Sequence, residues 1–394
     1  MTPATATPAG RPLRIAVAGL GAIARTAHLP LLERRRELFE ITALCDLSPS
    51  ALAELGDRYG VPPGHRHTST EALLADGGFD AVVLLTSGSH GPAAEAALRA
   101  GHAVLCEKPL AFTRAEAARI ADAERAQQRG PRLMVGYMKQ YDPAARRLAA
   151  LLAEAGGPSR VRSAEVCVLH PTGPDQLAFA RLPAPGGDAD PAELAALTAR
   201  DDALTDTALG SAATPEMRSL YHIVIGSISH DLSLLRTAAG APETVDLAAM
   251  WGASAEGPGS VELSGRLPGG ARYAIRWHFL PGHAAYRETF TVHHESGTLE
   301  LAFPSPYLMN APTVLTETST APGEGPHTER RAEHRSVTEA FEEELAAFHT
   351  MVTEGTPPRT GTEGALADLT TAQRAVAAYA AHHRLPCDGE AATA

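Results

Sequence analysis

The 394-residue sequence has no apolar run near the roughly 18 residues that a membrane helix needs. Residues 1–12, rich in Thr, Pro, Ala and Gly, lack the apolar segment of a secretory signal and are expected to form a flexible tail. The four cysteines form no C-x-x-C pair, which favours free thiols in a reducing cytoplasm. Positive charge is scarce, and the formal net charge of −12 argues against a nucleic-acid partner. We therefore expect a cytoplasmic protein that binds neither membranes nor nucleic acid.

Hydrophobic residues make up 44% of the chain and charged residues 20%, as in ordinary globular proteins, and the length predicts two domains. In the first third, short apolar runs alternate with helical patterns. We expect strands over 13–18, 41–45, 80–86, 103–106 and 133–136, a weaker one near 65–68, and helices over 22–39, 48–59, 91–100 and 113–129. This alternation predicts a Rossmann-type α/β domain with a doubly wound parallel sheet.

The rest of the chain carries partly alternating segments separated by turn signals, which predict an α+β domain on a large, mostly antiparallel open sheet. Its expected strands cover 160–170, 261–267, 271–280, 286–294 and 297–303, followed by helices over 337–354 and 362–384. Residues 171–219, rich in Pro, Ala and Asp, show no clear strand and suggest a lid or disordered insert. The expected parts are a tail (1–12), a nucleotide-binding domain (13–136), and a substrate and oligomerisation domain (137–394) with a variable insert (171–219) and a final helix (361–384).

A G-x-G-x-x-A string follows the first expected strand and opens the first expected helix. Its candidate dinucleotide-binding residues are Gly19, Gly21, Ala22, Ile23 and Ala24. The glycines allow a tight turn and a close approach of backbone to pyrophosphate, and the small alanine lets the helix pack near the strand. Asp46 ends the second expected strand, where a carboxylate can bind ribose hydroxyls and repel a 2′-phosphate. We therefore predict NAD(H) as the cofactor, with NADP(H) as the alternative.

A second motif, Cys106-Glu-Lys-Pro109, follows the fourth main strand at the sheet edge where ligands bind. Its wider string, 98–110, closely resembles the signature of the Gfo/Idh/MocA oxidoreductases, named after glucose–fructose oxidoreductase and inositol dehydrogenase. Residues 19–24, Thr86 with His90, 136–143 and the closing segments 340–348 and 355–358 also resemble this family. The resemblance spans about residues 13–384, apart from the 171–219 insert.

The resemblance implies a nicotinamide held between the two domains, a small-molecule substrate, and a homodimer or homotetramer formed through the open sheet. It assigns Lys108 to orienting substrate and cofactor and to proton transfer. It places Glu107 near the nicotinamide ribose, and Thr86, Ser87 and His90 in the loop that lines the nicotinamide pocket. Tyr137, Lys139 and His222 are weaker candidates for contact with substrate.

The sequence departs from the family pattern at one catalytic position. Many members carry Asp-x-Gly-x-His in the second domain, whereas this chain has Gly226-Ser-Ile-Ser-His230, so the histidine is present and the carboxylate is missing. A histidine titrates near neutral pH and suits general acid–base catalysis, so His230 and Lys108 are the predicted catalytic residues. Asp231, His222 and Tyr221 are the nearby candidates to replace the missing partner. The close histidine pairs 65/67, 293/294 and 382/383 lack the acidic or thiol companions of a metal site, and no metal is expected.

Three functions remain open at this point. The leading one is an NAD(H)-dependent dehydrogenase or reductase that transfers a hydride between nicotinamide C4 and a carbinol or carbonyl carbon of a sugar-like, cyclitol-like or specialised-metabolite substrate. The second is a redox-neutral reaction on tightly held NAD, such as glycoside cleavage. The third is a non-catalytic NAD-binding sensor or regulator, which the loss of the carboxylate at position 226 would fit.

Overall fold

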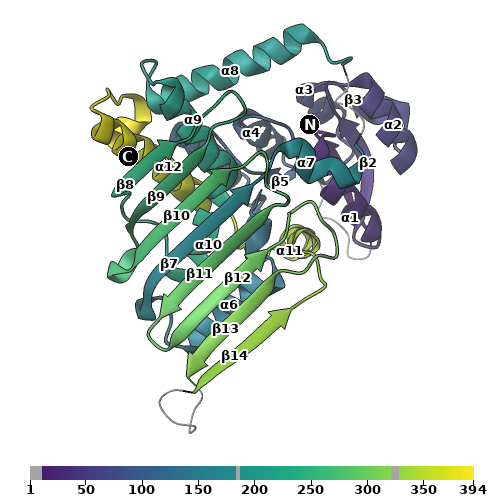
Figure 1. Ribbon diagram of the computed structural model, residues 1–394. Helices are drawn as coiled ribbons and strands as arrows, with labels where there is room; N and C mark the ends of the chain where they lie inside the picture. Colours follow the sequence, from purple (N-terminus) through teal and green to yellow (C-terminus); the bar gives the residue numbers. More distant parts are fainter. Residues whose placement is uncertain (1–10, 183–186, 321–327) are drawn as a thin grey trace. The chain divides into compact units, whose positions relative to one another are not determined.

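The computed structural model describes residues 11–182, 187–320 and 328–394 (Figure 1). Nearly all of the expected flexible tail, 1–12, therefore lies outside the described residues. The chain forms two compact units, each discontinuous in sequence. The first unit comprises 1–137, 180–205 and 341–366, and the second comprises 138–179, 206–340 and 367–394. The domain boundaries drawn from the sequence stay a prediction.

The first unit is built on a six-stranded parallel sheet with the order β3-β2-β1-β4-β5-β6. Its strands are β1 (Leu13–Ala18), β2 (Phe39–Cys45), β3 (Arg66–His67), β4 (Ala81–Leu84), β5 (Ala103–Glu107) and β6 (Leu133–Gly136). Its helices are α1 (Leu29–Arg34), α2 (Pro49–Tyr59), α3 (Thr70–Asp76), α4 (Gly91–Arg99), α5 (Arg114–Ala126), most of α8 (Pro191–Leu209) and most of α11 (Ala340–Glu354). This strand order is that of a Rossmann domain, and the doubly wound fold predicted from the sequence is confirmed.

Burial explains why these strands read as unbroken apolar runs. All residues of β4, β5 and β6 are buried, because helices cover a parallel sheet on both faces. A distant segment protects the β6 edge. Val135 donates its backbone N–H to the Thr360 carbonyl at 3.1 Å, and the Thr360 hydroxyl donates to the Val135 carbonyl at 2.7 Å. The sheet edge is thereby paired by residues more than 200 positions later in the chain.

The second unit is built on an eight-stranded sheet with the order β14-β13-β12-β11-β7-β10-β9-β8. Its strands are β7 (Val161–His170), β8 (Leu247–Trp251), β9 (Ser260–Arg266), β10 (Arg272–Phe279), β11 (Arg287–His294), β12 (Gly297–Phe303), β13 (Val314–Thr320) and β14 (Glu329–Arg335). Its helices are α6 (Pro143–Glu154), α7 (Gly173–Leu177), α9 (Pro215–Ile223), α10 (Ser229–Ala239) and most of α12 (Thr362–His383). Every pairing is antiparallel except β7 with β10, so the mostly antiparallel α+β prediction is confirmed.

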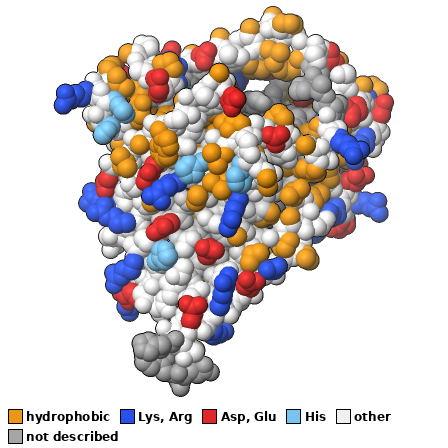
Figure 2. Space-filling view, in the orientation of Figure 1, with side chains coloured by type: hydrophobic (Ala, Val, Ile, Leu, Met, Phe, Trp, Pro, Cys, Tyr) orange, Lys and Arg blue, Asp and Glu red, His pale blue; other side chains and the backbone are white. Residues whose placement is uncertain are grey.

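Helices α6 and α10 contact strands of this sheet, and Figure 1 shows both on one face of it. Alternation along the strands follows from that arrangement. In β10, Tyr273, Ile275 and Trp277 are buried, while Arg272 and Arg276 are exposed. Figure 2 shows hydrophobic side chains among basic, acidic and histidine side chains over the uncovered face. Assembly through this face stays a prediction.

Of the two interpretations of residues 171–219, a disordered insert is wrong and a lid stays a prediction. Its described residues include α7, the long helix α8 and the start of α9. Helix α8 lacks an apolar stripe because most of its residues face solvent, and this concealed it in the sequence. Strands β8, β13 and β14 were also not predicted. The helix expected over 22–39 is shorter in the structure. A π-helical turn (Ala24–His28) leads into α1, which ends at Arg34, and β2 begins at Phe39.

A search of the described helices finds none that is long and apolar enough to cross a membrane.

Candidate functional site

The glycine turn after β1 has the geometry of a dinucleotide cradle. Gly19 has φ +96°, and a Cβ there would lie 2.5 Å from the Leu85 carbonyl carbon, so only glycine fits without a shift of backbone. Gly21 is exposed, and a Cβ built on it meets nothing within 4 Å. Ala22 and Ile23 are half-buried at the start of the following helix, and Ala24 is buried. The turn thus leaves open space beside backbone amides at a helix start, which suits a pyrophosphate.

Asp46 connects this turn to the next strand. Its Oδ2 accepts the Leu20 N–H at 2.7 Å, and its Oδ1 accepts the Ser48 N–H at 2.9 Å. The carboxylate is therefore held at the carboxyl end of β2, between the glycine turn and the start of α2, and is half-buried. A ribose bound at this edge would meet a fixed hydrogen-bond acceptor.

The loop after β4 carries three further predicted residues. Thr86 is half-buried, Ser87 is exposed and His90 is buried just before α4. His90 donates its Nδ1–H to the Pro109 carbonyl at 2.8 Å, because a carbonyl oxygen can only accept. Burial lowers the pKa of His90 and favours the neutral ring. This hydrogen bond joins the β4 loop to the segment that follows β5.

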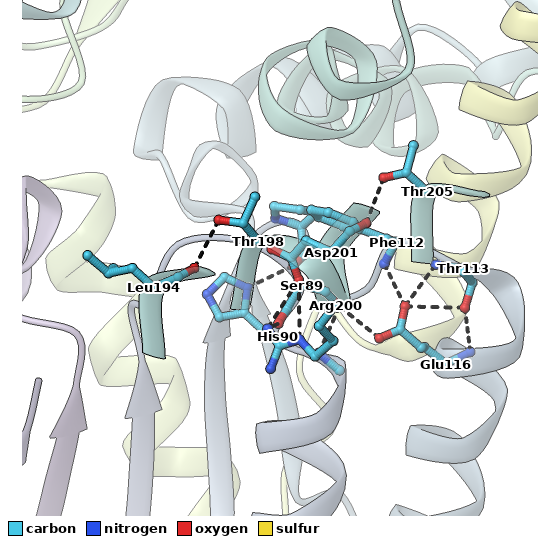
Figure 3. A network of polar contacts seen from close by, with 12 residues as sticks. Ser89, His90, Phe112, Thr113, Glu116, Leu194, Thr198, Arg200, Asp201 and Thr205 are labelled. Atoms are coloured by element: carbon cyan, nitrogen blue, oxygen red, sulfur yellow. Dashed lines mark hydrogen bonds and ion pairs between the residues drawn. The ribbon is translucent and has the colours of Figure 1, made fainter. Parts of the chain in front are cut away.

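A polar network fixes the same loop from two sides (Figure 3). The Ser89 hydroxyl donates to Glu116 Oε1 at 2.8 Å, and the other oxygen of Glu116 accepts the N–H groups of Phe112 and Thr113. Helix α8 lies on the other side, where Asp201 packs against Gly88 so closely that a Cβ at position 88 would lie 1.9 Å from Oδ2. The loop therefore has little freedom to move.

Glu107 and Lys108 end β5, and Glu107 belongs to a buried acid–histidine pair. His28 Nε2 lies 3.0 Å from Glu107 Oε1, and Glu107 Oε2 accepts the Lys108 N–H at 3.2 Å. Burial opposes the charge on Glu107, but His28 and Lys108 outweigh it, so the pKa of Glu107 is lowered. Glu344 of α11 is fully buried nearby, and burial together with the Glu107 charge raises its pKa well above the usual range. One carboxylate is thus ionised beside a second that is kept neutral.

In the second unit, His230 lies at the start of α10 and is half-buried. A π-helical turn (Val224–Ile228) precedes it, and a Cβ built on Gly226 meets nothing within 4 Å. The space for the missing carboxylate is therefore present although the side chain is not. His222 is exposed on α9 and contacts Tyr221 edge-on at 5.9 Å. Tyr137, by contrast, belongs to the first unit and is buried.

Lys139 belongs to a buried charge cluster that the sequence did not predict. Its Nζ lies 2.5 Å from both carboxyl oxygens of Glu288 and 3.8 Å from Asp231 Oδ1, and the Tyr286 hydroxyl donates to Glu288. Burial opposes the charge on Lys139, but Glu288 and Asp231 outweigh it and raise its pKa. Burial and the Glu288 charge raise the pKa of Asp231 well above its usual range. Asp231 thus faces this cluster, not the position of a partner for His230.

Some of these residues were detectable in the sequence. Glu288, Phe290 and Val292 occupy alternate positions of β11 that face inward. A charged residue at one of these inward positions was the signal in the sequence for a buried charge. His65 and His67 do have an acidic companion, since Asp76 Oδ2 lies 2.8 Å from His65 Nδ1 and 3.1 Å from His67 Nε2. In the described part of the chain, no cluster of three or more residues that could hold a metal ion is found.

Comparisons with known proteins identify an NAD-binding Rossmann fold in the first unit. The model of a family described as the oxidoreductase family with an NAD-binding Rossmann fold matches residues 13–137. The inositol 2-dehydrogenase of Acidiphilium cryptum is 37% identical over 171 residues, which are 42% of this chain and 48% of that protein. The match thus spans about half the length of that curated relative.

Two solved structures resemble the chain over most of its length. An aldose–aldose oxidoreductase from Caulobacter crescentus, complexed with glycerol, has a TM-score of 0.67 at 21% identity and covers 94% of this chain and 98% of its own. A 3-ketoreductase from Actinomadura kijaniata, in complex with TDP-benzene and NADP, has a TM-score of 0.68 at 20% identity and covers 92% and 96%. At sequence identities this low, the similarity to the two structures shows a shared fold alone. The model of the Gfo/Idh/MocA oxidoreductase family, with its NAD-binding Rossmann fold, thus matches the part of the chain that carries the glycine turn and the Glu-Lys-Pro segment, residues 13–137.

Proposed function

We propose that this protein is an NAD(H)-dependent oxidoreductase that acts on a sugar-like, cyclitol-like or specialised-metabolite substrate. When bound, the nicotinamide supplies the hydride acceptor or donor at C4. The protein's own residues bind and orient the dinucleotide and manage the proton of the substrate hydroxyl. The observation that carries this proposal is the cradle formed by Gly19, Gly21 and Asp46, whose open space and fixed acceptor suit a pyrophosphate and a ribose.

The two units would contribute different residues to the reaction. The glycine turn, residues 22–24, Asp46, Thr86, Ser87, His90, Glu107 and Lys108 would bind and surround the dinucleotide. Lys108 and His230 would hold the substrate oxygen and move its proton, because an amine and an imidazole can each donate and accept near neutral pH. Tyr137, Lys139 and His222 stay candidates for substrate contact. Lys139 forms a buried ion pair with Glu288, which favours a structural role for this lysine over a direct role in catalysis.

Parallel titrations of the purified protein with NADH and NADPH, followed by nucleotide fluorescence, test the cofactor half of the proposal. We expect NADH binding that Asp46→Ala weakens and His230→Ala leaves unchanged. A polyol and keto-sugar screen, run in both directions, then tests turnover with His230→Ala as the catalytic control. Binding of neither nucleotide to the native protein contradicts the proposal.

The glycine at position 226 favours a second candidate function. A family member without the carboxylate four residues before its histidine fits a non-catalytic NAD-binding sensor. The same experiments separate the two functions. Tight NADH binding with no turnover of any polyol or ketone in either direction would favour the sensor, whereas turnover abolished by His230→Ala supports the enzyme.

A further inference from the structure

Residues 180–205 belong to the first unit, and Asp188 in this segment makes a contact at the dinucleotide end of that unit. Its Oδ1 accepts the Ser48 hydroxyl at 2.6 Å, and its Oδ2 accepts the Ser50 N–H at 2.7 Å. Ser48 is the N-cap of α2 and accepts the Ala51 N–H at 3.2 Å. A carboxylate from a distant part of the chain thus accepts hydrogen bonds at the N-terminus of α2, where the helix dipole is positive.

The contact between Asp188 and Ser48 matters because Ser48 lies close to Asp46, the proposed ribose-binding carboxylate. Ser48 follows Asp46 by two residues, and Asp46 Oδ1 accepts the Ser48 N–H. In a Rossmann domain, this carboxylate hydrogen-bonds the 2′-hydroxyl of the adenosine ribose, and a residue near it accommodates the 2′-phosphate where NADP is bound. A 2′-phosphate there would need the very donors, Ser48 Oγ and Ser50 N–H, that Asp188 already occupies. Asp188 would also repel it, since two anions that share one set of donors destabilise each other.

The segment that carries Asp188 is anchored a second time, through α8. Asp201 packs against Gly88, and Arg200 lies 3.4 Å from the Ser89 carbonyl oxygen. Figure 3 shows these α8 residues beside Ser89 and His90. The two anchors lie on the loops that follow β2 and β4, both at the carboxyl edge of the parallel sheet. Asp188 is therefore held in place by a structured segment, although its own side chain is exposed.

We propose that Asp188 is a specificity-determining residue that excludes NADP(H) by occupying the donors that a 2′-phosphate would require. NAD(H), with a 2′-hydroxyl, needs no anion site there and is tolerated. Asp188 then acts together with Asp46, and the selectivity is divided between a residue of the Rossmann sheet and a residue of the inserted segment. The inference rests on the proposed binding of a dinucleotide by the first unit, but it does not depend on catalysis.

Fluorescence titrations with NADH and NADPH measure the effect directly as the ratio of the two dissociation constants. We expect the native protein to prefer NADH, and Asp188→Ala to tighten NADPH binding about tenfold while NADH binding changes by less than about threefold, as expected for one like-charge contact near the surface. Asp188→Asn removes the charge but keeps an acceptor, and should give an intermediate ratio. Glu193→Gln is the matched control, an exposed acid of the same segment for which the structure describes no ion pair or hydrogen bond.

Salt dependence provides a second readout that needs no variant. Because exposed charges are screened, raising the ionic strength should narrow the preference of the native protein for NADH and leave Asp188→Ala less affected. An unchanged NADPH-to-NADH ratio in Asp188→Ala overturns the inference and leaves the proposed function intact. A native preference for NADPH also overturns it. If no variant binds either nucleotide, both the proposed function and the inference are wrong.

Discussion

Gly226 stands where the Asp-x-Gly-x-His pattern has its carboxylate, and the structure makes that difference testable. A Cβ at position 226 meets no atom within 4 Å, so a side chain can be added without displacing neighbours. Gly226→Asp restores the carboxylate four residues before His230. We expect turnover to rise by roughly tenfold, since an oriented base contributes at least that much to proton transfer. Steady-state kcat in the oxidative direction measures this.

Gly226→Ala is the control for that experiment, because it reproduces the change in helix propensity without the carboxylate. An equal gain in Gly226→Ala and Gly226→Asp would show that backbone stiffness, and not the acid, limits the native protein. No gain in either variant would mean that His230 does not depend on a partner at this position.

Single residues show where prediction from the sequence succeeds and where it stops. Gly19 and Asp46 were predictable because both act through local geometry, one in a turn and one at a strand end. Glu288 and Asp188 were not predicted, because their partners lie 149 and 140 residues away along the chain. The register of β11 marks Glu288 as inward-facing, but which residues pair with Glu288 and Asp188 follows from the tertiary fold and not from a local pattern.

One carboxylate adds hydrogen bonds to the backbone pairing between β1 and β4. Asp80 directly precedes β4 and accepts hydrogen bonds from the Arg11 guanidinium at 2.8 and 2.9 Å and from the Arg14 N–H at 2.9 Å. Burial opposes its ionisation, but these donors outweigh it and lower the pKa of Asp80 to about 2. An acid with a lowered folded-state pKa stabilises the fold above its unfolded pKa. The contribution, about 2 kcal/mol, should therefore be lost as the pH falls from about 4 to about 2.

Urea unfolding of the native protein and of Asp80→Asn, followed between pH 2 and pH 7, measures this contribution. Asp80→Asn should be less stable at pH 7 and should show a flatter pH dependence below pH 4. Identical slopes for the two proteins in that range would contradict the assignment.

Lys139, just after β6, and Glu288 of β11 form a second long-range connection, this time inside the second unit. Lys139→Met leaves Glu288 and Asp231 buried without their cation, which should lower the free energy of unfolding by about 3–5 kcal/mol. Adding Glu288→Gln removes the uncompensated charge and keeps an acceptor for Tyr286, so the double variant should be more stable than Lys139→Met. Denaturant unfolding of both variants checks the order, and equal stabilities would rule out the charge argument.

Whole elements were predictable where burial leaves a regular pattern. Buried β4, β5 and β6 read as apolar runs, and β10 and β11 as alternation. The edge strand β14 and its neighbour β13 consist mainly of polar and charged residues, and α8 is mostly exposed, so none of them shows a hydrophobic period. The elements missed are thus those that contribute least to a core.

Across the whole molecule, the chain contains two lysines, Lys108 and Lys139. Lys139 is buried with Glu288, whereas Lys108 is half-buried beside the proposed dinucleotide site. An amine-reactive acylating reagent should therefore modify Lys108 and the N-terminal amine much faster than Lys139, and NADH should protect Lys108. Peptide mapping by mass spectrometry reads each position separately. Equal labelling of the two lysines, or no protection by NADH, would contradict these environments.

The discontinuity of the first unit has a consequence for how the protein is made. Its sheet edge at Val135 is paired by Thr360, and Phe341 packs against His28, so a nascent chain that ends near residue 137 lacks partners it needs. At ordinary elongation rates the ribosome takes on the order of ten seconds or more to synthesise the intervening segment. During that interval the nucleotide-binding half emerges with an open strand edge. The nascent protein would therefore be a natural client for a chaperone at the exit tunnel.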